Sequence, residues 1–108
     1  MGFIVAITTC PNEEVAENIA ADLLSSRLIA CATLLPGATS LYRWQGAIHK
    51  DREIVLLLKS RRDNFQEIAS YITKNHPYEL PELIALPIEE GLSAYLKWLD
   101  HELTSPTP

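Results

Sequence analysis

A hairpin turn and a long strand are predicted within residues 42–60, which run YRWQGAIHKDREIVLLLKS. Gln45-Gly46 suits the turn because glycine adopts the positive φ that a tight hairpin requires. Ala47 to Ser60 then returns as one strand, with the apolar run Ile54 to Leu58 at its buried centre. Strands this long leave exposed edges in a small chain, and pairing between subunits would protect them. The stretch therefore favours an oligomer.

Three further strands are predicted on either side of this stretch. Ala30 to Tyr42 forms the other arm of the hairpin, with a bulge or bend at Pro36-Gly37, because proline cannot donate a hydrogen bond to a strand ladder. Phe3 to Thr9 is rich in β-branched and apolar residues and is typical of a strand. Leu83 to Leu86 is predicted as a short buried strand.

Apolar residues at helical spacing predict three helices. The first begins at Pro11-Asn12, and the second begins near residues 60–63, which have capping-box spacing. The second helix stops before His76-Pro77, because a residue that precedes proline resists the helical conformation. Ser93 can cap the third helix. The fold class is therefore α+β: a ferredoxin-like βαββαβ order with an extra C-terminal helix, and helices on one face of an antiparallel sheet.

The composition indicates one compact domain, residues 1–104, followed by a disordered tail, residues 105–108. The chain has 108 residues, 47% of them hydrophobic, and a net charge of -5. No basic run is longer than Arg61-Arg62, so we expect no nucleic-acid partner. Apolar runs such as Ile54 to Leu58 are too short to span a membrane, and the N-terminus lacks a signal-peptide pattern. We therefore expect a cytoplasmic protein.

Residues 76–82, HPYELPE, are the stretch best suited to a ligand, because two prolines restrict the conformation of a segment with one imidazole and two carboxylates. His76 as a metal ligand would suit copper or zinc. Alternatively, His76 caps the second helix or bonds a neighbour. Glu79 and Glu82 could complete an oxygen-containing shell, although such residues alone are more typical of solvated or paired charges.

The two cysteines are not predicted to form a disulfide, because no secretory signal accompanies them. Cys31, between two alanines, is typical of a small core residue. Cys10 precedes Pro11 at the expected end of the first strand, where solvent or a metal ion could reach it. No Gly-rich phosphate loop, His-Glu-x-x-His sequence or nucleophile elbow is present, so we do not expect an enzyme.

Several motifs follow one another along the chain, and together they resemble the CutA family of divalent-cation tolerance proteins as far as about residue 103. They are Thr8-Thr9-Cys10-Pro11, Ala30-Cys31-Ala32, residues 36–42 (PGATSLY), Trp44-Gln45-Gly46, residues 76–82, and residues 86–91 (LPIEEG) with Tyr95 and Trp98. The resemblance implies a ferredoxin-like fold, a tight homotrimer similar in architecture to PII signalling proteins, and a link to copper and other divalent metals.

The chain departs from the family at the expected copper ligands. Copper-binding members carry a Cys near the end of the first strand and a His-His pair before Pro-Tyr. Thr8 stands here at the Cys position and Asn75 at the first His position, and only His76 matches directly. Cys10 lies two residues further on, on the same side of an extended strand, and could replace the missing thiolate. The resemblance thus implies a site of His76, Cys10 and Glu79 for copper or another divalent cation, with no organic cofactor.

Three aromatic residues are candidates for a subunit boundary. Tyr42, Trp44 and Tyr95 could line a cleft between subunits, but we favour anchoring of the trimer interface, because interfaces are enriched in such side chains. The leading hypothesis is a homotrimeric, metal-binding protein that contributes to metal tolerance, with itself and metal ions as partners. The alternatives are a PII-like trimer that binds a small molecule for signalling, and a trimeric interaction scaffold without a metal function.

Overall fold

The computed structural model describes residues 2–103, and within them the chain forms four strands and three α-helices. In chain order these are β1 (Phe3–Cys10), α1 (Glu13–Ser25), β2 (Cys31–Trp44), β3 (Ala47–Arg61), α2 (Phe65–Asn75), β4 (Ile84–Ile88) and α3 (Ser93–Leu103). The predicted order of elements is confirmed. The predicted tail, residues 105–108, lies outside the described residues.

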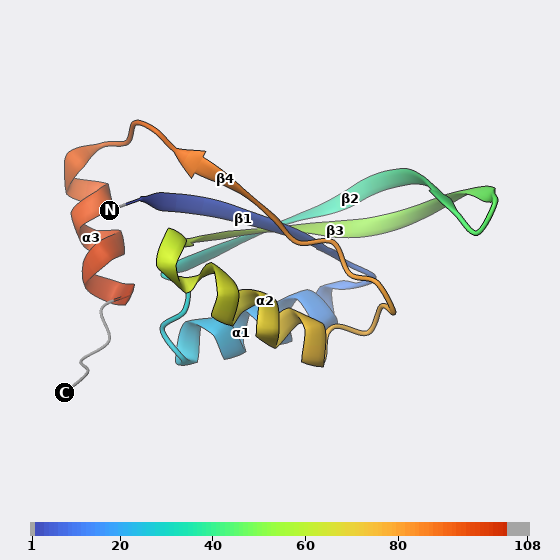
Figure 1. The fold of residues 1–108 in the computed structure, drawn as a ribbon, viewed down its shortest axis with the longest axis horizontal. Coiled ribbons are helices and arrows are strands. Elements are labelled where there is room, and N and C mark those ends of the chain that lie inside the picture. Colours follow the sequence, from blue (N-terminus) through green and yellow to red (C-terminus); the bar gives the residue numbers. More distant parts are fainter. Residues whose placement is uncertain (1, 104–108) are drawn as a thin grey trace.

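The four strands form one antiparallel sheet in the order β2-β3-β1-β4. Figure 1 shows α1 and α2 side by side against one face of this sheet, and α3 beyond the end at which β1 begins. The predicted α+β class, with helices on one face, is therefore confirmed. No helix among residues 2–103 is both long enough and apolar enough to cross a membrane.

The long hairpin forms as the sequence predicts. Gln45 and Gly46 connect β2 to β3 with φ of 52° and 81°, the left-handed pair that a two-residue hairpin turn needs. The register of β2 against β3 shifts between Leu35 and Ala38, where Pro36-Gly37 lies. The outer half of the hairpin projects beyond the helices (Figure 1), so the molecule is elongated, with extents of 47 × 28 × 22 Å.

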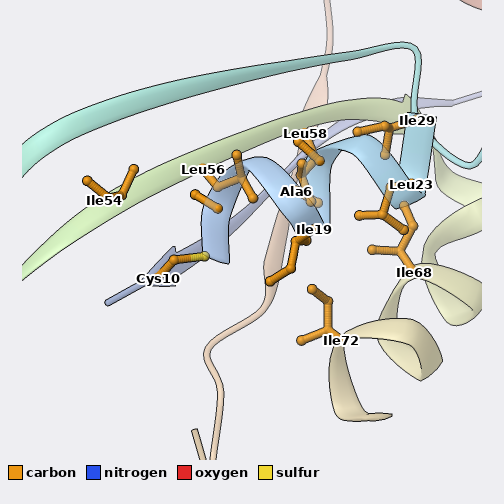
Figure 2. Close-up of a cluster of buried hydrophobic side chains, with 12 residues drawn as sticks. Ala6, Cys10, Ile19, Leu23, Ile29, Ile54, Leu56, Leu58, Ile68 and Ile72 are labelled. Carbon is orange, nitrogen blue, oxygen red and sulfur yellow. The ribbon is translucent and has the colours of Figure 1, made fainter. Parts of the chain in front are cut away.

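The hydrophobic core lies between the sheet and the helices α1 and α2. Leu56 and Leu58 of β3 are fully buried and belong to the same cluster as Leu23 of α1 and Ile72 of α2 (Figure 2). Because side chains alternate along a strand, the alternate residues Ile54, Leu56 and Leu58 of β3 enter this core. Cys10, at the end of β1, belongs to the same cluster and is 0% exposed.

The second helix begins later than predicted. Ser60 does not cap it but remains in β3, paired with Ile4 of β1, and its hydroxyl donates to the carbonyl oxygen of Leu28 at 2.6 Å. A short 3-10 turn, Arg62–Asn64, follows before α2 begins. The capping-box spacing was misleading because the serine hydroxyl finds a distant backbone acceptor, while the backbone stays in the sheet.

The strand β4 is less buried than predicted. Among residues 2–103 it pairs with β1 alone, and it lies at the edge of the sheet. Ala85 packs against the core, whereas the alternate residues Ile84 and Leu86 are 50% and 52% exposed. Their side chains point to the opposite face of the sheet from Ala85, because successive residues of a strand point to opposite faces. An apolar strip is therefore left uncovered on this chain.

Candidate functional site

His76 is a buried structural residue at the end of α2. Its backbone N–H donates to the Ile72 carbonyl at 2.9 Å and closes the last turn of the helix. The ring Nε2 lies 2.8 Å from the Thr9 carbonyl oxygen, which can only accept, so Nε2 carries the proton and donates. Nδ1 then accepts from the backbone N–H of Tyr78 at 3.1 Å. Both ring nitrogens are occupied, and neither offers a free lone pair to a metal ion.

The predicted accessibility of Cys10 is wrong, because alternation along β1 directs its side chain into the core. Figure 2 shows it among the core side chains that pack beneath the sheet, and it is 0% exposed. Burial, followed by the nearby charge of Glu53, raises the pKa of the Cys10 thiol to about 11. Metals bind the thiolate form, so this thiol is a poor ligand at neutral pH. Thr8 and Cys10 pair with the alternate core residues Leu56 and Ile54 of β3, so both lie on the same side of β1.

The remaining positions of the expected copper site do not complete it. Thr8 is 0% exposed, and its hydroxyl finds no hydrogen-bond partner among residues 2–103. Asn75 is exposed and donates from Nδ2 to the Tyr71 carbonyl at 2.9 Å. Glu79 is also exposed. Among residues 2–103, no three His, Cys, Asp or Glu side chains are grouped to hold a metal ion, so His76, Cys10 and Glu79 do not form a metal centre within one chain.

A cleft of about 480 Å³ lies between the hairpin and the segment that follows α2. Its hairpin wall consists of Ser40, Leu41, Tyr42, Trp44, Asp51 and Glu53. Its other wall consists of Thr9, Tyr78, Glu79, Leu80 and Glu82. A volume of this size is typical of sites for small molecules. We call this feature the acidic cleft, because four of its lining residues are carboxylates.

The strand geometry explains why these side chains meet. Tyr42 and Trp44 are alternate residues of β2, and Asp51 and Glu53 are alternate residues of β3, so each pair projects to one side of its strand. Ser40 lies directly opposite Asp51 in the hairpin register. The hairpin therefore presents aromatic and acidic side chains together on one wall of the acidic cleft.

Glu53 is the most buried carboxylate of the acidic cleft, with 7% of its surface exposed. Its Oε2 accepts a hydrogen bond from the Tyr78 hydroxyl at 2.6 Å, and it forms no ion pair with Lys or Arg within the part of the chain that the structure describes. Burial, and then this bond to Glu53, raise the pKa of Tyr78 far above its usual value. The Tyr78 phenol therefore stays protonated and keeps donating.

Two further contacts hold the aromatic residues of the acidic cleft. The centroids of the His76 and Tyr78 rings are 4.7 Å apart. The His76 ring therefore contacts the ring of Tyr78 and also accepts the hydrogen bond from the Tyr78 backbone N–H. On the hairpin wall, the Tyr42 hydroxyl donates to Asp51. The Tyr42 ring stacks on the His49 ring, with 5.5 Å between the two ring centroids. His76 thus contributes to the acidic cleft by positioning Tyr78.

The structure brings together only some of the residues that the sequence singled out. Tyr42, Trp44 and Glu79 line the acidic cleft, whereas Tyr95 lies on α3 beside Trp98, with ring centroids 5.6 Å apart, and is not among the lining residues. The sequence motifs do not single out Glu53 as a site residue. The pattern that could have indicated it is its position two residues after Asp51, which places both carboxylates on one side of the strand.

The fold and the acidic cleft define a small α+β protein with a candidate binding site beside a long hairpin. The chain belongs to the CutA1 divalent ion tolerance protein family, whose family model matches residues 4–102. The family resemblance expected from the motifs is confirmed.

Relatives in bacteria and plants match nearly the full length of the chain. The divalent-cation tolerance protein CutA of Yersinia pestis (strain Pestoides F) is 48% identical over 100 residues, covering 93% of this chain and 84% of the relative. The solved structure of the divalent cation tolerance protein from Thermus thermophilus has a TM-score of 0.91 and 43% identity, covering 94% of this chain and 99% of that one. CutA1 from Oryza sativa has a TM-score of 0.93 and 36% identity, covering 99% and 97%.

Proposed function

We propose that this chain contributes to divalent-cation tolerance as a homotrimer that binds cations in its acidic cleft. One observation carries the proposal: Asp51, Glu53, Glu79 and Glu82 line a single cleft, and no Lys or Arg within residues 2–103 forms an ion pair with any of them. Uncompensated carboxylates in a cleft concentrate cations there. The names of the relatives describe tolerance to divalent cations, which supports the same role.

We propose that these carboxylates bind copper(II) or another divalent ion that accepts oxygen ligands. Thiolate ligands select copper(I), but the Cys10 thiol is buried and stays protonated at neutral pH. Glu79 remains a candidate ligand because it lines the acidic cleft. His76 is assigned a structural role, since both of its ring nitrogens are bonded within the chain.

Calorimetric titration with copper(II) tests this assignment. The double variant Asp51→Asn, Glu79→Gln removes two charges from the acidic cleft, and Glu13→Gln, Glu67→Gln removes two from exposed helical positions as a matched control. We expect the cleft variant to bind copper(II) at least about tenfold more weakly than the control, a difference of about 1.4 kcal/mol. Equal affinity in the two variants would exclude the acidic cleft as the metal site.

The homotrimer is proposed from the apolar surface that one chain leaves uncovered. Large hydrophobic side chains that are about half or more exposed include Leu35, Leu41, Ile48, Leu80, Ile84, Leu86 and Leu92. Soluble monomers seldom expose so much large apolar surface, whereas subunit interfaces bury it. Light scattering should give three times the 12.1 kDa mass of one chain. A monomer mass at micromolar concentration would contradict the trimer.

The topology and the location are proposed alongside the trimer. A βαββαβ order of elements, with β1 and β3 at the centre of the sheet, supports a ferredoxin-like topology. We also propose a cytoplasmic location, which cell fractionation followed by detection of the protein would test.

The second candidate function is a PII-like module that binds a small molecule and signals. The size of the acidic cleft favours it, because about 480 Å³ is far more space than a single metal ion requires. Native mass spectrometry after gentle purification separates the two candidates. A retained organic ligand without metal would favour the second, and bound metal without an organic ligand would favour the first.

A further inference from the structure

We propose that the acidic cleft binds a small organic cation, namely a short alkyl chain that carries two ammonium groups. The inference rests on the proposed function in one respect, since both place the cation site of this chain in the acidic cleft. It goes further by naming the chemical class of the ligand. It also makes the divalent metal ion a competitor for the same carboxylates.

The burial of Glu53 is the first argument. This carboxylate is 7% exposed and accepts one hydrogen bond, from Tyr78 at 2.6 Å, but no Lys or Arg in the described part of the chain pairs with it. An ionised carboxylate that is removed from water without a counter-charge costs several kcal/mol. An ammonium group supplies that charge together with three N–H donors. Glu53 is therefore the anchoring position for one end of the ligand.

The aromatic wall is the second argument. Trp44 and Tyr42 line the same cleft as Glu53, and aromatic faces attract organic cations through their ring quadrupoles. The rings of Trp44 and Tyr42 also provide apolar contacts for a methylene chain. A bare metal ion uses neither kind of surface. The lining of the acidic cleft thus matches a cation that has an apolar body.

The distribution of carboxylates is the third argument, and it sets the number of ammonium groups. Glu53 and Asp51 belong to β3, whereas Glu79 and Glu82 belong to the segment between α2 and β4. Among residues 2–103, no three such ligands are grouped to hold one metal ion. Carboxylates that two separate segments contribute can each bind one ammonium group of the same ligand. A diamine can meet both walls at once.

Titration of 1,4-diaminobutane into the intact protein tests the proposal, with 1,4-butanediol as a neutral probe of the same length. Calorimetry measures the affinity, and tryptophan fluorescence reports the location. The chain has two tryptophans, so the variant Trp98→Phe leaves Trp44 as the only source of the signal. We expect saturable binding of the diamine with a change in Trp44 fluorescence, and no saturable binding of the diol.

Three variants make the test specific. Glu53→Gln and Asp51→Asn each remove one charge from the acidic cleft, and Glu67→Gln removes one from an exposed position on α2. We expect each cleft variant to weaken diamine binding by about tenfold or more, as loss of a charged hydrogen bond implies, and Glu67→Gln to leave it within about twofold. Asp51→Asn keeps the test decisive if Glu53→Gln fails to fold.

The outcomes separate this inference from the proposed function. Displacement of the diamine by copper(II) would support both. If the diamine fails to bind while copper(II) binding depends on the cleft carboxylates, the inference is overturned and the proposed function stands. If the diamine binds as predicted and copper(II) does not bind, the inference stands and the proposed metal site is overturned. Equal diamine affinity in all three variants overturns the inference. The inference is also overturned if the diamine does not bind and Glu53→Gln has the mass of a monomer. That result would show that Glu53 contacts a neighbouring subunit, which fills the cleft.

Discussion

The hydrophobic core and the acidic cleft meet at the end of β1, and they differ in the polar groups that they contain. Cys10 is sealed in the core with a protonated thiol, whereas its neighbour Thr9 lines the acidic cleft. The core excludes charge from its cluster of apolar side chains. The acidic cleft gathers four carboxylates, one of them Glu53, which is buried without a cationic partner among residues 2–103. The difference shows that adjacent residues of one strand serve separate purposes, according to the side of the strand on which they lie.

His76 connects these two regions. It bonds the Thr9 carbonyl through Nε2 and the Tyr78 backbone through Nδ1, and Tyr78 in turn donates to Glu53. The histidine that the sequence predicts as a metal ligand therefore links β1 to the wall of the acidic cleft through two hydrogen bonds. The comparison leads to predictions in which substitutions of core residues change stability, while substitutions of cleft carboxylates change cation binding.

The largest effect is expected from a cavity in the core. Leu56→Ala removes a side chain that is 0% exposed, and we expect the free energy of unfolding to fall by about 3 kcal/mol. Leu24→Ala on α1 is the matched control, because Leu24 is 41% exposed, and it should cost about 0.5 kcal/mol or less. Urea denaturation at one fixed protein concentration measures both. Equal losses in the two variants would contradict the placement of the core.

A smaller loss of stability is expected for His76→Ala. The change leaves the buried Thr9 carbonyl and the Tyr78 N–H without their partners, which costs about 2 kcal/mol in the free energy of unfolding. His49→Ala removes an imidazole from the hairpin, where that side chain is exposed, and serves as the control. Urea denaturation of the two variants side by side is the measurement. A His76→Ala protein as stable as the control would show that the two hydrogen bonds of His76 do not contribute to the free energy of unfolding.

The smallest effect concerns the pH dependence that Cys10 contributes. Its folded-state pKa of about 11 lies above the ordinary value of 9.0, so the folded protein holds the proton more tightly than the unfolded chain does. This contribution is complete below about pH 9 and is lost as the pH rises towards 11. We expect the free energy of unfolding to fall by about 1 kcal/mol more between about pH 8 and pH 10 in wild type than in Cys10→Ala. Parallel profiles for the two proteins would contradict the burial of the thiol.

Local signals in the sequence predict most of the fold. Gly46 specifies the hairpin turn, and Pro36-Gly37 marks the bulge. Asn12 caps α1 through a bond from the Val15 N–H to its Oδ1 at 2.9 Å, as the sequence indicates. Each of these features depends on residues close together in the chain. Ser60 misled the prediction of α2 because its acceptor, the Leu28 carbonyl, is distant in the sequence.

The candidate site was harder to predict for the same reason. Tyr42, Trp44 and Glu79 could be chosen from motifs, but the burial of Glu53 depends on a segment that follows α2. The adjacent proline suggests that Cys10 lies near solvent, whereas alternation along β1 directs its side chain into the core. Residue types indicate cation chemistry, and only the folded chain shows which of them face the acidic cleft.

The most direct test compares copper(II) affinity in wild type, Glu53→Gln and His76→Ala by calorimetric titration under identical conditions. Glu53 lines the acidic cleft, whereas both ring nitrogens of His76 are bonded within the chain. The account predicts that Glu53→Gln weakens copper(II) binding by about tenfold or more, and that His76→Ala weakens it less, because His76 only positions Tyr78 beside Glu53. Loss of binding in His76→Ala together with wild-type affinity in Glu53→Gln would contradict the account.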